Sequence, residues 1–93
     1  MDIVKKIRSG NVGEVDLLEY ITDNDINVAI AVAESDIATE PILDIGAHDK
    51  DRAVRLAVVK NMNTGSRTLR YLLHDSDEEI SSFAKKRLVE DKE

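Results

Sequence analysis

Three sets of side chains in this sequence could carry chemistry: paired aspartates, two histidines and a group of arginines. The aspartates recur every 26 residues in two rows, Asp23, Asp49 and Asp75, and Asp25, Asp51 and Asp77. Carboxylates can bind a divalent cation, but packed helices lie about 8–10 Å apart, which is too far for acids of neighbouring units to share one ion. We therefore interpret both rows as helix N-caps that accept hydrogen bonds from backbone N–H groups.

Part of these rows also resembles a calcium-binding EF-hand loop. Asp23, Asp25 and Asn27 alternate along the chain, and Glu34 occupies the twelfth position counted from Asp23. An EF-hand needs glycine at its sixth position for a sharp turn, and this chain has Val28 there. Because apolar residues follow Val28, we expect a helix here and no metal site.

The two histidines, His48 and His74, also lie 26 residues apart, and an aspartate follows each. A zinc ion would need both imidazoles within about 2.1 Å, which the spacing of packed helices excludes. A His-Asp pair could belong to a hydrolytic triad, but Ser66 and Ser76 are better explained as helix caps. We expect both histidines at helix C-termini, and we expect no catalytic residue and no cofactor.

Arginines gather in the C-terminal half together with a tyrosine. Arg67, Arg70 and Tyr71 are three and four residues apart, so they would be neighbours on one helix, and Arg52 and Arg55 precede them. Arginine and tyrosine are enriched among the residues that dominate protein interfaces. We predict that Arg55, Arg67, Arg70 and Tyr71 bind a protein partner, with a solvated surface or a nucleic-acid site as the alternatives.

The elements that position these side chains are expected to be helices of a single domain, since the chain has 93 residues with only four glycines and one proline. One Phe, two Tyr and no Trp leave Val, Ile, Leu and Ala to form the core. The absence of cysteine excludes disulfides and suits a reducing compartment, so we expect a cytoplasmic protein. We find neither a signal peptide nor an apolar run long enough to cross a membrane.

The net charge of −6 is unevenly distributed. Residues 14–49 contain ten acids and no base, whereas residues 50–93 contain ten bases and eight acids. An acidic field repels phosphate, so nucleic-acid binding is disfavoured. The acidic first half and the arginines of the second half could also meet in a head-to-tail homo-oligomer.

The chain is built from copies of one 26-residue unit. Residues 28–53 and 54–79 share seven identities, at Val28/Val54, Ala31/Ala57, Val32/Val58, Leu43/Leu69, His48/His74, Asp49/Asp75 and Asp51/Asp77. We predict an all-α fold, a short right-handed α-solenoid that forms one domain over residues 1–93. Its three helix pairs span about 2–27, 28–53 and 54–79, and a closing helix spans 80–90.

Helix signals recur at equivalent places in the units. Thr39 and Thr64 are expected to be N-caps, with Pro41 in the first turn after Thr39. A capping box at residues 76–79 is expected to open the last helix. The helix over 26–34 is almost entirely apolar, so we expect it to be buried on most sides.

Two segments, VRLAVVKN (54–61) and NTGSRTLRYLLHDSD (63–77), resemble the leucine-rich repeat variant, a helical relative of HEAT and armadillo repeats. Gly65 replaces the usual proline, and the earlier unit has Ser35, Ile37 and Ala38 in place of Asn, Asn and Thr. The matching positions are Val54, Arg55, Ala57, Val58, Asn61, Asn63, Thr64, Leu69, Leu72 and Asp75. The resemblance implies a right-handed stack of short helix pairs.

The sequence therefore predicts a small helical-repeat protein that acts as a protein–protein interaction or scaffold module and is not an enzyme. The alternatives are a nucleic-acid-binding domain that uses the arginines of the third unit, and an accessory subunit of an enzyme.

Overall fold

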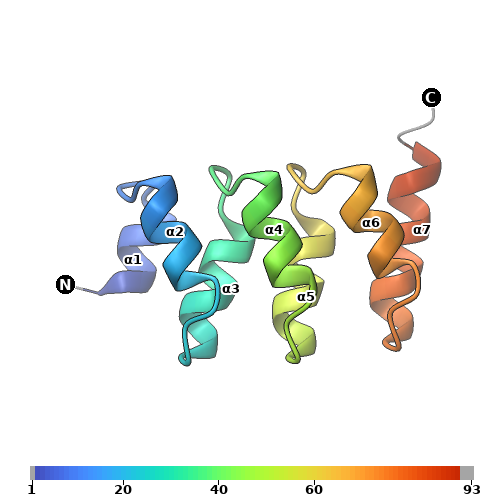
Figure 1. Ribbon diagram of the computed structural model, residues 1–93, viewed down its shortest axis with the longest axis horizontal. Helices are drawn as coiled ribbons and strands as arrows, with labels where there is room; N and C mark the ends of the chain where they lie inside the picture. The colour runs from blue at the N-terminus through green and yellow to red at the C-terminus, as the bar shows by residue number, and fades with distance from the viewer. Residues whose placement is uncertain (1, 91–93) are drawn as a thin grey trace.

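The computed structural model describes residues 2–90, which form helices and loops and contain no β-strand within that range. The helices are α1 (Ile3–Arg8), α2 (Glu14–Tyr20), α3 (Ile26–Glu34), α4 (Glu40–Ala47), α5 (Arg52–Lys60), α6 (Ser66–Leu72) and α7 (Glu78–Glu90). They lie in two rows, with α1, α3, α5 and α7 in one and α2, α4 and α6 in the other (Figure 1). The predicted all-α class is thus confirmed for residues 2–90.

The core lies between the two rows and repeats with the sequence. Leu17, Leu43 and Leu69 hold the same position in successive units, and each is fully buried. The α3 helix is buried on most sides, as its apolar composition predicts, through Val28, Ala29, Ala31, Val32 and Ala33. Each short helix covers its neighbours, so a unit buries its apolar face only by packing against the next one.

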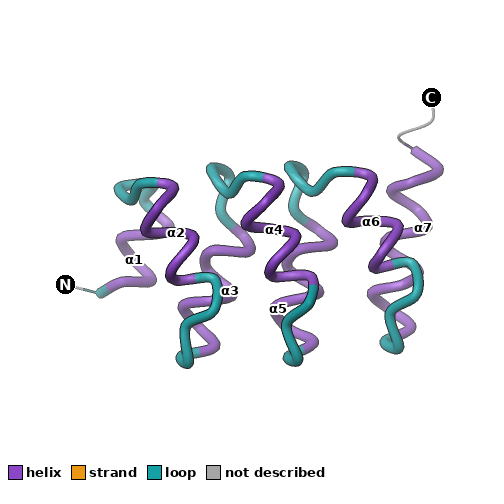
Figure 2. The backbone as a smooth tube through the Cα atoms, in the orientation of Figure 1, coloured by secondary structure: helices purple, strands orange, loops and turns teal. Residues whose placement is uncertain are grey.

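The two aspartate rows form one capping motif three times, in the loops that join α2 to α3, α4 to α5 and α6 to α7 (Figure 2). The first aspartate of each loop accepts a 2.8 Å hydrogen bond from the backbone N–H of the second. The second then accepts from the first turn of the next helix, from the N–H groups of Asn27, Ala53 and Ile80. The interpretation as N-caps is confirmed for Asp25 and Asp51, and Asp77 makes the equivalent hydrogen bond. The first row differs from the prediction, because its aspartates lie two residues before the N-cap position and accept from the capping aspartate rather than from the helix.

Two other predicted caps are wrong. Gly65, not Thr64, is the N-cap of α6, because Thr64 is buried and its hydroxyl donates to the Val58 carbonyl oxygen at 2.6 Å. The α7 helix begins at Glu78, and its first turn donates from Ile80 N to Asp77 rather than to Ser76. In both places the capping position lies one residue later than predicted.

At two positions the backbone requires glycine, because a side chain would be strained at Gly10 or would clash at Gly46. Gly10 has a φ of +79° and closes α1, donating its N–H to the Ile7 carbonyl while Asn11 donates to Lys6, which is the Schellman geometry. Gly46 lets α4 approach its neighbours, because a Cβ there would lie 2.8 Å from Val58 Cγ2 and 3.2 Å from Ile21 Cδ1. The stiff, β-branched Val58 has little freedom to move away.

Asparagine side chains tie the third unit to the second. The Asn61 amide donates to the carbonyl oxygens of Ala33 at 2.8 Å and Ser35 at 2.9 Å. Asn63 in turn donates to the carbonyls of Asp36 at 2.7 Å and Ala38 at 3.0 Å. These bonds join the α5–α6 loop to the α3–α4 loop.

Arg87 repeats this tie at the next joint. It lies 26 residues after Asn61 and donates to the carbonyl oxygens of Val59 at 3.1 Å and Asn61 at 2.6 Å. These carbonyls are the repeat counterparts of those that Asn61 binds in the preceding unit. An arginine on α7 therefore replaces the asparagine of the third unit.

Within residues 2–90, no side chain makes such a tie across the joint between the first two units. Ser35 holds the position of Asn61, and its hydroxyl accepts a hydrogen bond from Ile37 N within its own loop. The ion pair across this joint, Arg8 with Glu34, measures 4.0 Å between two largely exposed side chains. The first unit is thus held mainly by apolar packing.

Candidate functional site

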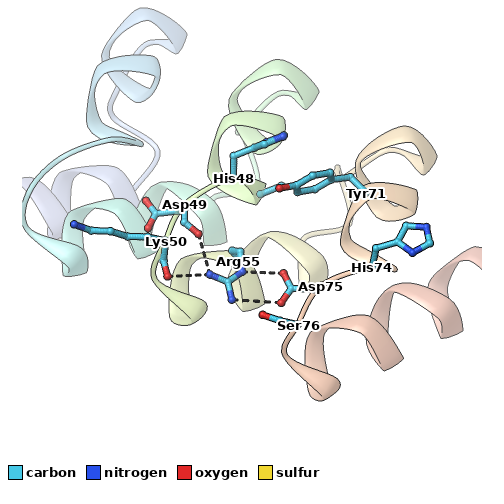
Figure 3. Close-up of a pocket in the computed structure, with 9 residues that line it drawn as sticks. His48, Asp49, Lys50, Arg55, Tyr71, His74, Asp75 and Ser76 are labelled. Carbon is cyan, nitrogen blue, oxygen red and sulfur yellow. Dashed lines mark hydrogen bonds and ion pairs between the residues drawn. The ribbon is translucent and has the colours of Figure 1, made fainter.

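An open groove runs between the loop after α4 and the C-terminal end of α6 (Figure 3). It has a volume of about 430 Å³ and is lined by Ala47, His48, Asp49, Lys50, Arg55, Tyr71, His74, Asp75 and Ser76. We call it the His-Tyr groove. Its two walls are equivalent segments of neighbouring units, since residues 47–50 and 73–76 share one repeat position. The groove is therefore a product of the stacking of the units.

A stacked pair of rings forms one wall. The centroids of His48 and Tyr71 are 4.1 Å apart, and the ring planes are inclined by 21°. His48 Nδ1 lies 2.9 Å from the Asp44 carbonyl oxygen, so the tautomer with its proton on Nδ1 donates a hydrogen bond to α4. As predicted, His48 lies at a helix C-terminus, where it caps α4. Stacking on His48, which is itself bonded to α4, orients the Tyr71 ring. Tyr71 nevertheless keeps 48% of its surface exposed.

Arg55 also lines the groove, where it pairs with Asp75 of its own unit and binds backbone carbonyls of the preceding unit. Arg55 Nε lies 2.8 Å from Asp75 Oδ2, and Arg55 Nη2 lies 3.3 Å from Asp75 Oδ1. Arg55 Nη1 also donates to the carbonyls of Asp49 at 2.9 Å and Lys50 at 3.0 Å. The two side chains are only 15% and 6% exposed. This bidentate, charge-assisted arrangement holds the charges of the groove in place.

The predicted binding residues do not all meet in one patch. Arg55 and Tyr71 line the His-Tyr groove, but the guanidinium of Arg55 already donates hydrogen bonds to Asp75 and to the Asp49 carbonyl. Arg70 lines a different groove of about 270 Å³, together with Leu73, Lys85, Leu88 and Val89, which we call the C-terminal groove. Arg67 is exposed on α6 and lines neither groove.

Arg52, the remaining arginine of the predicted cluster, is also engaged. Its Nε lies 2.5 Å from Asp77 Oδ2, and its Nη2 lies 2.9 Å from Glu79 Oε1. The hydrogen bond from Arg52, aided by that from Ile80 N, lowers the pKa of Asp77 to about 2. The same carboxylates raise the pKa of Arg52. Two of the four arginines in this region thus have their charge balanced, Arg52 by acids of the next unit and Arg55 by an acid of its own unit.

The groove is lined by two histidines and a serine. Among residues 2–90, no hydrogen bond joins a histidine to a serine. Over the same range, no three His, Cys, Asp or Glu side chains are grouped so that they could hold a metal ion. None of the described helices is long and apolar enough to cross a membrane.

The sequence did not predict the His48–Tyr71 contact, although one signal for it exists. Tyr71 follows His48 by 23 residues, three fewer than the repeat, so it precedes the equivalent of His48 by one helical turn. Adjacent units then bring the two rings together. A function for this groove has to be inferred from its own geometry, since no family model, no curated protein and no solved structure matches the chain.

Proposed function

We propose that this chain is a protein–protein interaction module, built as a short right-handed α-solenoid of the leucine-rich repeat variant type. The 26-residue repeat of burial and capping supports the solenoid. The observation that carries the function is the stacked His48–Tyr71 pair, which presents a fixed, half-exposed aromatic ring above an open groove. Tyrosine in such a position loses little conformational entropy when a partner binds.

The groove indicates the chemistry of the partner segment. The rings offer an apolar face for an aromatic or aliphatic side chain, and Lys50 and His74 add polar residues to the lining. The opposing charges of Arg55 and Asp75 are already paired, so the partner needs no compensating charge. A short polar segment with one apolar anchor residue fits these requirements. Since the chain contains no cysteine, we seek its partner among cytoplasmic proteins.

The arrangement of the arginines weighs against the nucleic-acid alternative. Arg52 and Arg55, which could have bound phosphates, are paired with Asp77, Glu79 and Asp75. Phosphate binding needs several free basic side chains along one surface. Arg70 lines the C-terminal groove, whereas Arg67 is exposed outside it. We therefore retain protein binding as the proposed function.

A site-specific photo-crosslinking experiment tests this proposal. A photoreactive phenylalanine derivative at position 71 is expected to capture a defined partner protein from the native cytosol. The same derivative at Met62, which is 83% exposed in the α5–α6 loop, is the matched control and is expected to capture no such partner. Met62 precedes α6, whereas residues 74–76 of the groove follow it.

Substitution of Tyr71 then measures its contribution to the affinity for the captured partner. Tyr71→Phe keeps the ring and is expected to bind nearly as well as the wild type. Tyr71→Ala removes a hot spot worth about 2 kcal/mol and is expected to weaken binding roughly thirtyfold. Equal affinity of the alanine variant and the wild type, or crosslinks that form equally well from position 62, would overturn the proposal.

A further inference from the structure

The C-terminal groove offers a second, independent surface for association. Its apolar residues are Leu73 of α6 and Leu88 and Val89 of α7, and Val89 is 60% exposed. Arg70 and Lys85 complete the lining, and both are exposed. The surface is thus an apolar strip flanked by positive charge. Such a surface fits an amphipathic helix with acidic flanks.

The α2 helix at the other end of the molecule has the complementary features. Val15 is 72% exposed and Leu18 is 46% exposed, and their spacing of three residues places them on the same side of the helix. Exposed Glu14, Asp16 and Glu19 surround them, and residues 14–49 contain no lysine or arginine. The α2 surface is therefore an apolar strip flanked by negative charge.

These two surfaces cannot meet within one molecule. The α2 helix and the α6–α7 pair lie near opposite ends of the long axis, along which the molecule extends 40 Å (Figure 1). We propose that α2 of one copy binds the C-terminal groove of a second copy, so that the protein associates head to tail. Because the two contacting surfaces differ, each added copy leaves a free groove and a free α2, and association proceeds to open chains or to a ring.

The size and charge of the contact predict how the association behaves. A helix of seven residues against a groove of about 270 Å³ covers a small area, so the association is weak and reversible. Opposite charges flank the apolar strips, so salt weakens the association by screening. Sedimentation velocity at increasing protein concentration, at low and at high salt, measures both properties. We expect the mean sedimentation coefficient to rise with concentration, and to rise less at high salt.

Charge reversal identifies the two surfaces. Arg70→Glu/Lys85→Glu makes the groove acidic, and Glu14→Lys/Glu19→Lys makes α2 basic. Each variant alone then brings like charges together, and we expect self-association to weaken by at least about tenfold. In a mixture of the two variants, the acidic groove of one meets the basic α2 of the other, and the basic groove meets the acidic α2. We expect the mixture to associate as the wild type does.

The control is Lys60→Glu/Arg67→Glu, which changes the net charge by the same amount as the groove variant, at two exposed residues that line neither groove. We expect it to associate like the wild type, and circular dichroism checks that every variant is folded. A wild type that remains monomeric up to millimolar concentration at low salt would overturn the proposal. Two variants that fail to associate when mixed, or a control that weakens association equally, would also overturn it. None of these outcomes depends on the His-Tyr groove.

Discussion

Arginines of the same region differ in the partners that the surrounding units provide. Arg55 meets Asp75 and two backbone carbonyls, and Arg52 meets Asp77 and Glu79. The planar guanidinium suits such sites, since its five donors can bind a carboxylate and carbonyls together. At the scale of single residues, Arg52 and Arg55 are therefore engaged within the protein, whereas Arg67 and Arg70 are exposed and Tyr71 is a half-exposed aromatic side chain.

Removal of Arg55 is expected to destabilise the fold. The Arg55→Met variant leaves Asp75 as an unpaired charge that is only 6% exposed, at a cost of about 3–5 kcal/mol. Urea denaturation followed by circular dichroism measures this loss. The double variant Arg55→Met/Asp75→Asn is expected to lose less than the single variant, because no charge is left unpaired. Arg67→Met, at an exposed site, should change stability by less than about 0.5 kcal/mol. Equal losses in Arg55→Met and Arg67→Met would contradict the structural role of Arg55.

The ion pair between Arg52 and Asp77 is expected to make stability depend on pH in the acid range. Its carboxylate has a folded-state pKa of about 2, below the ordinary value near 3.9. The stabilisation is therefore complete above the unfolded pKa and is lost as the pH falls from about 4 to about 2. Asp77→Asn keeps an oxygen for capping but does not titrate. The difference between the urea midpoints of wild type and Asp77→Asn should shrink over this range, whereas a constant difference would contradict the assignment.

At the scale of the elements, the joints between units differ although the helices are alike. The second joint has Asn61 and Asn63, and the third has Arg87, each donating to carbonyls of the preceding unit. Ser35 is too short to make the equivalent bond and instead closes its own turn. Sequence identity between units therefore does not imply equal coupling between them.

Completion of the first joint is expected to stabilise the protein. Ser35→Asn places an amide at the repeat position of Asn61, and the repeat counterparts of the Asn61 acceptors are the carbonyls of Ile7 and Ser9. The Ile7 carbonyl already accepts from Gly10 N, so the Ser9 carbonyl is the expected acceptor. We expect a gain of about 0.5–1.5 kcal/mol for each hydrogen bond formed, measured by urea denaturation. Ser9→Asn is the matched control, since Ser9 holds the same repeat position with no described unit before it. A gain in Ser9→Asn equal to that in Ser35→Asn would show that the joint is not responsible.

The sequence predicted the helices well and the contacts between them poorly, for a physical reason. Helix positions follow from apolar spacing and from local caps such as Asp25 and Asp51, which act within a few residues. Two caps were misplaced because burial of Thr64 and the position of Asp77 depend on packing. Sequence patterns could not separate Arg55 from Arg67, since a carboxylate 20 residues away decides which is buried.

At the scale of the whole molecule, cohesion increases toward the C-terminus. The Asn61, Arg55 and Arg87 contacts all lie in the second and third joints. The first joint has the exposed Arg8–Glu34 pair and shorter helices, with six residues in α1 and seven in α2. In a linear stack, each unit is held only by its neighbours, so a weak joint lets an end unit open by itself.

Native-state hydrogen exchange is expected to reveal this gradient. The amides of α1 and α2 should exchange through local opening at a lower free energy than those of α5 and α6. The Ser35→Asn variant should slow exchange in α1 and α2 more than in α6. A single exchange free energy throughout α1–α7 would contradict the gradient and would indicate that the stack unfolds as one unit.

The position of Arg87 has a consequence for how the length of this protein could change. Its carbonyl acceptors are those that an asparagine of a further unit would bind. If a second copy of residues 54–79 followed Glu79, its own asparagine would bind Val59 and Asn61, and Arg87 would close the longer stack. His74 would then face a tyrosine as His48 now does. The stack could therefore be lengthened by one 26-residue unit at a time with the same closing helix, and each added unit would form one more groove of this type.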